Sequence, residues 1–148
     1  MYKQWLKGTW FLDTFTATGE DGETIHVMGE GATGFICYSH DGWVSVQMSQ
    51  ANRPRYEIPT AQGGTDEQTL AAARGLFTYA GKYTVDEENA IVYHNLDFSL
   101  ITNWIGSSQK RYITKENENV LILSADPTKI GPGGKMRKVQ LRWIRMES

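Results

Sequence analysis

Residues 79–96 read YAGKYTV, DEEN and AIVYHNL, which is two strand-like runs joined by a charged turn. In a β-strand, alternate side chains point to the same face of the sheet. The first run therefore places on one face Tyr79, Gly81, Tyr83 and Val85. The second run places on one face Ala90, Val92, His94 and Leu96. This pair of runs predicts an antiparallel hairpin with a largely apolar face that carries a few polar groups.

The sequence on both sides of this hairpin repeats the same pattern. Asp21-Gly22 and Asp41-Gly42 each separate two strand-like runs, and Asp-Gly is a strong hairpin signal. Residues 43–49 alternate apolar and polar side chains, as a half-buried strand does. We count about nine short strands at roughly ten-residue spacing, a pattern typical of an all-β barrel or sandwich. We therefore predict an all-β chain forming a single antiparallel up-and-down barrel, with residues 1–148 as one domain.

One short helix interrupts the β pattern. Residues 65–68 read TDEQ, which has the form of a capping box with Thr65 as N-cap and Gln68 reaching back. Apolar side chains follow at helical spacing, and Gly75 is a plausible end. Those side chains are Leu70, Ala73 and Phe77. Residues 98–105 are irregular and predict a helical turn or a lid-like loop.

Composition narrows the class of protein. The chain has 148 residues, 40% of them hydrophobic, and a net charge of −2, which gives no reason to expect nucleic acid as a partner. Cys37 is the single cysteine, so no intramolecular disulfide can form, which favours a reducing compartment. No apolar run approaches membrane-spanning length. We expect a cytoplasmic protein without a membrane partner, and the sequence leaves a homodimer open.

Several polar and aromatic side chains are candidates for a site inside the barrel. The strand period would bring His94 close to Gln109 and Arg111 on inward faces, and converging polar groups in an apolar cavity typify small-molecule sites. His94 is either a core residue with a satisfied partner or a proton shuttle. An inward arginine must be paired, so Arg111 has either Asp13 or Asp97 as a partner, or a ligand oxygen. The aromatic candidates for the same site, which are alternatively plain core, are Tyr38, Tyr79, Tyr83 and Trp104.

Motifs in a fixed order along the chain resemble those of the bacterial and fungal lipocalin-like domain family. They are Gly8-Thr9-Trp10, Gly34 through Tyr38 to Asp41-Gly42, Arg53-Pro54-Arg55, Tyr79-Ala80-Gly81-Lys82-Tyr83, His94, Asn103-Trp104-Ile105-Gly106, Gln109-Lys110-Arg111 and Leu141-Arg142-Trp143-Ile144-Arg145. The resemblance implies a calycin-like barrel. It also implies that Trp10 packs at the closed end with Arg145 lying over its ring, which is a structural cation–π contact.

Three functions remain open at this point. The first is a binding protein that holds a hydrophobic or carbonyl-bearing small molecule, with Arg111, Gln109 and Tyr83 at its polar end. The second is a cofactor-free isomerase, cyclase or dehydratase acting on a polyketide-like or other carbonyl substrate, with His94 moving the proton and Arg111 stabilising an enolate. The third is a barrel filled by its own side chains that only makes interfaces. We expect no metal, because the three histidines lie on separate elements, and no cofactor.

Overall fold

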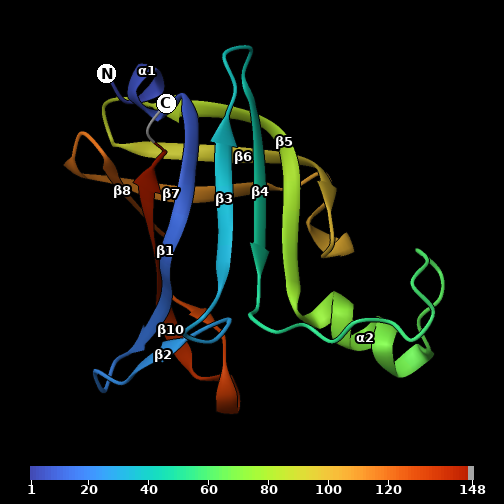
Figure 1. Ribbon diagram of the computed structural model, residues 1–148. Coiled ribbons are helices and arrows are strands. Elements are labelled where there is room, and N and C mark those ends of the chain that lie inside the picture. The colour runs from blue at the N-terminus through green and yellow to red at the C-terminus, as the bar shows by residue number, and fades with distance from the viewer. Residues whose placement is uncertain (147–148) are drawn as a thin grey trace.

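The computed structural model describes residues 1–146, in which ten strands form one sheet. The first long strand pairs with the last, so the sheet closes into a barrel (Figure 1). Each barrel strand pairs with the next along the chain, which confirms the predicted antiparallel up-and-down barrel. The barrel strands are Gly8–Gly19 (β1), Thr33–Tyr38 (β3), Trp43–Ser49 (β4), Leu76–Asp86 (β5), Ile91–Ser99 (β6), Ser108–Asn117 (β7), Val120–Ser124 (β8) and Met136–Arg145 (β10). The short strands Thr24–His26 (β2) and Thr128–Lys129 (β9) extend β1 and β10.

The predicted helix is present as α2 (Asp66–Arg74), and its ends are as the sequence indicates. The Thr65 side chain accepts a hydrogen bond from the backbone N–H of Gln68, and the Gln68 side chain accepts one from the backbone N–H of Thr65. The helix stops at Gly75. Its expected apolar stripe does not pack, because Leu70 is 55% exposed and Phe77 belongs to β5. α2 lies at the end of the barrel opposite α1 (Figure 1).

The expectation of one helix was wrong, because residues Tyr2–Leu6 form a second one, α1. Five residues are too few for helical periodicity to be legible. This helix is held from outside: the carboxylate of Glu87 accepts hydrogen bonds from the backbone N–H groups of Tyr2 and Lys3, each at 2.8 Å. An acidic group at a helix N-terminus is favourable for the unpaired N–H groups there. Short 3-10 turns also occur at Thr102–Trp104 (η1), within the irregular stretch, and at Pro132–Gly134 (η2).

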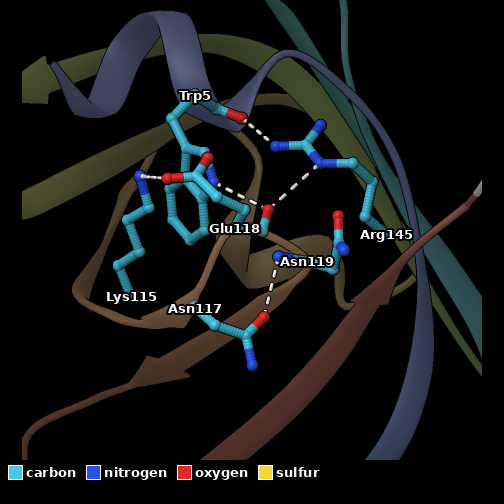
Figure 2. Close-up of polar contacts among 6 residues, drawn as sticks. All are labelled: Trp5, Lys115, Asn117, Glu118, Asn119 and Arg145. Carbon is cyan, nitrogen blue, oxygen red and sulfur yellow. Dashed lines mark hydrogen bonds and ion pairs between the residues drawn. The ribbon is translucent and has the colours of Figure 1, made fainter.

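The barrel is closed at the end that carries α1. Trp10 is fully buried, its indole N–H donates to the carbonyl of Leu6, and the guanidinium of Arg145 lies 4.0 Å from its ring centre. Figure 2 shows how Arg145 also donates to backbone carbonyls of Trp5 and Glu118, while the indole of Trp5 donates to the same Glu118 carbonyl. One side chain therefore joins α1, the β7–β8 turn and the barrel wall.

Replacing Arg145 with methionine should lower the free energy of unfolding by about 1–2 kcal/mol, because the variant loses charge-assisted hydrogen bonds and the cation–π contact while keeping side-chain volume. Urea unfolding followed by tryptophan fluorescence measures this. Arg145→Lys keeps the charge but not the planar guanidinium, so its free energy of unfolding should lie between those of the parent and of Arg145→Met. An Arg145→Met protein as stable as the parent would show that the closed end does not depend on this side chain.

Candidate functional site

A cavity of about 500 Å³ occupies the half of the barrel away from α1. Its volume is many times that of a water molecule and lies in the range of ordinary ligand pockets, so side chains do not fill the barrel. Most of the wall is apolar. The apolar side chains of the wall are Phe15, Ile36, Val46, Met48, Phe77, Ile101, Trp104, Leu123, Ala125, Pro127, Ile130, Val139, Leu141 and Trp143.

Four of the candidate side chains line this cavity: Tyr79 from β5, Trp104 from η1, and Gln109 and Arg111 from β7. The strand register explains the polar group on β7. Gln109 pairs with His94 and Arg111 with Val92, and partners across an antiparallel pair point to the same side of the sheet. Since His94 and Val92 are fully buried, Gln109 and Arg111 face the interior.

Arg111 has no carboxylate partner among residues 1–146. Of its two predicted partners, Asp13 binds Arg142 at 2.7 Å and Asp97 is exposed. The side chain of Arg111 is half-buried and donates to the carbonyl of Lys110 at 2.9 Å. A guanidinium carries five N–H groups, so most of its donor capacity remains for other acceptors.

His94 does not reach the cavity surface, and neither do Tyr38 and Tyr83. The ring of His94 is fully buried between two phenols: Nε2 lies 2.8 Å from the hydroxyl oxygen of Tyr38 and Nδ1 lies 2.7 Å from that of Tyr79. Tyr83 donates instead to the carbonyl of Ser39. In this structure the three residues form a polar layer beneath the cavity wall and are not in its lining, and their contact with a ligand stays a prediction.

Burial keeps this layer uncharged. Burial first, and then the nearby Arg111 guanidinium, lower the pKa of His94 from 6.5 to about 3. Burial raises the pKa of Tyr79, and it raises that of Tyr38 well above the usual range. At neutral pH the imidazole of His94 and the phenols of Tyr38 and Tyr79 on either side of it are thus all uncharged.

Trp143 is a member of the site that the sequence did not identify. It lines the cavity, it is 1% exposed, and its indole N–H has no hydrogen-bond partner among residues 1–146. A buried polar group without a partner is uncommon and calls for an explanation. The alternation of β10 indicates that Trp143 points inward, but only the coordinates show that its N–H is unpaired.

The lining also includes three charged residues from β7 and from the segment around β9, namely Lys110, Asp126 and Lys129. Asp126 accepts a hydrogen bond from the Tyr112 hydroxyl at 2.7 Å, and the ammonium group of Lys110 lies 4.7 Å from the centre of the Tyr112 ring. Within residues 1–146 no group of three or more histidine, cysteine or acidic side chains is placed to hold a metal ion. No helix in that range has the length and apolar character needed to cross a membrane.

Comparison with known proteins finds one curated relative and several solved barrels that resemble this chain. The 4′-hydroxy-3′-methoxypropiophenone carrier protein ppsC of Aspergillus oryzae is 28% identical over 109 residues, which cover 70% of this chain and 96% of that protein. Among solved structures, a redesigned beta barrel aligns over 98% of this chain and 95% of its own at 14% identity and a TM-score of 0.46. The redesigned barrel mFAP1 bound to DFHBI aligns over 97% of both chains at 18% identity and a TM-score of 0.44.

A family model also matches nearly the whole chain. The model of the lipocalin-like domain covers residues 7–146, which run from just before β1 to the residue after β10. The motifs quoted from the sequence fall within this range, and the closed up-and-down barrel is the architecture that they imply. The chain belongs to the lipocalin-like domain family.

Proposed function

We propose that this protein binds and carries a small, largely apolar molecule that has an oxygen acceptor at one end. The cavity has the volume and the apolar wall that such a ligand requires. Burial of the ligand's apolar surface would supply most of the affinity, and the few polar groups would fix its orientation.

The observation that carries this proposal is the chemistry of the polar groups deep in the wall, which are hydrogen-bond donors. Arg111 has unused N–H groups and no carboxylate partner in the described chain, and the indole N–H of Trp143 is unpaired there. Gln109 and Tyr79 are in the same wall, and the Gln109 amide, which also donates to the hydroxyl of Ser107, keeps one N–H for another acceptor. A carbonyl, enolate or phenolate oxygen would satisfy such a set, whereas a ligand with only donors would leave it unpaired.

The named ligand of the Aspergillus oryzae relative has this character, because it combines an aromatic ring with a ketone. We infer that the ligand of this chain is of the same class, an aromatic or similarly flat carbonyl compound. The observations favour a carrier over the isomerase, cyclase or dehydratase reading. A proton-shuttling His94 would need a ring nitrogen free to meet the substrate, and both nitrogens are engaged by the hydroxyl groups of Tyr38 and Tyr79.

Titration with 4′-hydroxy-3′-methoxypropiophenone should give saturable one-to-one binding with a dissociation constant of roughly micromolar order. Trp104 and Trp143 line the cavity, so tryptophan fluorescence reports occupancy directly. Recovered ligand should be chemically unchanged. An isomerised, cyclised or dehydrated product would contradict the carrier assignment.

A cavity-filling variant provides the control. Ala125 is a small residue in the cavity wall, and Ala125→Phe should abolish binding while the far-ultraviolet circular dichroism spectrum stays the same. Equal fluorescence changes in the parent and in this variant would mean that the compound binds elsewhere. Failure of every carbonyl compound in a panel to bind would overturn the proposed function.

A further inference from the structure

Three strands contribute one side chain each to a buried hydrogen-bonded chain: Tyr38 from β3, Tyr79 from β5 and His94 from β6. The imidazole lies in the middle, with Nε2 at 2.8 Å from the Tyr38 oxygen and Nδ1 at 2.7 Å from the Tyr79 oxygen. All three are at most 5% exposed. Tyr79 is the one of the three that lines the cavity.

A neutral imidazole has one N–H and one nitrogen lone pair. One tyrosine must therefore donate its hydroxyl proton to the ring, and the other must accept the ring N–H. The positions of the heavy atoms allow both directions. The two directions differ in which tyrosine keeps a hydroxyl proton that is not used within the chain of hydrogen bonds.

The surroundings of Tyr38 decide between the two directions. If Nε2–H donated to Tyr38, the hydroxyl proton of Tyr38 would need a second acceptor, and its hydroxyl has no other partner within residues 1–146. That proton would be buried without an acceptor, which is costly. In the opposite direction Tyr38 donates to Nε2 and Nδ1–H donates to Tyr79. The remaining proton is then on the Tyr79 hydroxyl, which also has no second protein partner within residues 1–146 but, unlike that of Tyr38, belongs to a residue that lines the cavity, where a ligand or water oxygen can accept it.

We propose that Tyr38, His94 and Tyr79 form a relay of fixed direction that presents the Tyr79 hydroxyl proton to the cavity and makes the site selective for ligands with a carbonyl oxygen. This inference rests on the proposed carrier function and identifies the Tyr79 hydroxyl as the group that recognises the ligand's carbonyl oxygen. His94 is a positioning residue here: it touches no ligand and acts through the Tyr79 hydroxyl. Because hydrogen bonds in a chain polarise one another, Tyr38 should strengthen the donor at the far end.

The first test is the tautomer of His94. Long-range ¹H–¹⁵N correlation spectra distinguish a protonated from an unprotonated ring nitrogen, and the other two histidines, His26 and His40, are exposed and serve as internal references. The relay requires Nδ1 protonated and Nε2 bare. The opposite tautomer, or a His94 that takes up a second proton near neutral pH, would overturn it.

The second test uses a matched pair of ligands, a propiophenone and the propylbenzene in which its C=O is CH₂. Tyr79→Phe should weaken ketone binding about fivefold to tenfold and leave the hydrocarbon nearly unaffected, because one hydrogen bond is lost. Tyr38→Phe should lower the ketone preference about twofold to fivefold, although Tyr38 does not line the cavity. A merely structural role for Tyr38 would reduce both affinities equally.

Tyr83→Phe is the matched control, because Tyr83 is also buried and is the cross-strand partner of His94, but its hydroxyl donates to the carbonyl of Ser39 and not to the His94 ring. Its ketone-to-hydrocarbon ratio should equal that of the parent. If the parent protein binds both ligands and none of the three variants changes the ratio, the relay is wrong and the carrier function stands. If neither ligand binds the parent protein and the wider carbonyl panel fails as well, the proposed function itself is wrong.

Discussion

Replacing Arg111 with methionine is expected to weaken binding of a carbonyl or anionic ligand by roughly tenfold to a hundredfold. Loss of a charge-assisted hydrogen bond in a partly buried site costs about 1.5–3 kcal/mol, and every 1.4 kcal/mol is about tenfold in affinity. Methionine keeps the length and apolar volume of the side chain, so the hydrophobic part of the ligand should still fit. Fluorescence titration of both proteins with the same ketone measures the difference.

The same substitution should not unfold the protein. Arg111 makes no salt bridge within residues 1–146, so its removal leaves no buried carboxylate unpaired. Arg142 is the matched control, because it pairs on the outer surface with Asp13 and Glu116. Arg142→Met should bind the ketone as the parent does. Arg111→Met with unchanged affinity but a much lower free energy of unfolding would assign Arg111 to stability instead of binding.

Much of the fold could be predicted from the sequence, because its determinants are local. The Asp-Gly turns and the period-two alternation specify antiparallel neighbours, and the capping box of α2 lies within four consecutive residues. Helix α1 could not be predicted in this way. It is stabilised by Glu87, which is 85 residues away from Tyr2 in the sequence. A tertiary contact of that kind is not visible in the sequence of the helix itself.

The sequence predicted which side chains face the barrel interior, but not where along the barrel axis each of them lies. Alternation indicates which side chains of a strand face inward, and it does so for Tyr79, His94 and Arg111 alike. It says nothing of the layer along the barrel axis, and this decides that Arg111 lines the cavity while His94 lies beneath it. Depth depends on how strands far apart in sequence stack their inward residues. The bulge between Ala80 and Gly81, for example, shifts the register of β5 against β6. Gly81 lies so close to β6 there that a side chain at this position would overlap the carbonyl of Asn95.

Acid is expected to destabilise the protein well above the pH at which carboxylates titrate. Burial first, and then the Arg111 charge, lower the pKa of His94 from 6.5 to about 3. Between these two values the unfolded chain binds a proton at His94 that the folded protein does not bind. The free energy of unfolding must therefore fall as the pH falls, by up to about 1.4 kcal/mol per pH unit. From pH 7 to 4.5 the loss attributable to His94 should reach about 2–3 kcal/mol.

Urea unfolding at several pH values in that range measures the slope, and two variants assign it. His94→Gln does not titrate and should give a flatter dependence, even though it is less stable at pH 7. His40→Gln changes an exposed histidine and should keep the steep dependence of the parent. Hydrogen bonds with Glu23 and Asn89 lower the pKa values of Asp21 and Asp86, respectively. Those two carboxylates therefore affect stability mainly below about pH 4.5, outside the range in which the slopes are compared. Equal slopes in the parent and in His94→Gln would mean that His94 exchanges its proton in the folded state as freely as it does in the unfolded chain, and that the neutral layer beneath the cavity does not exist.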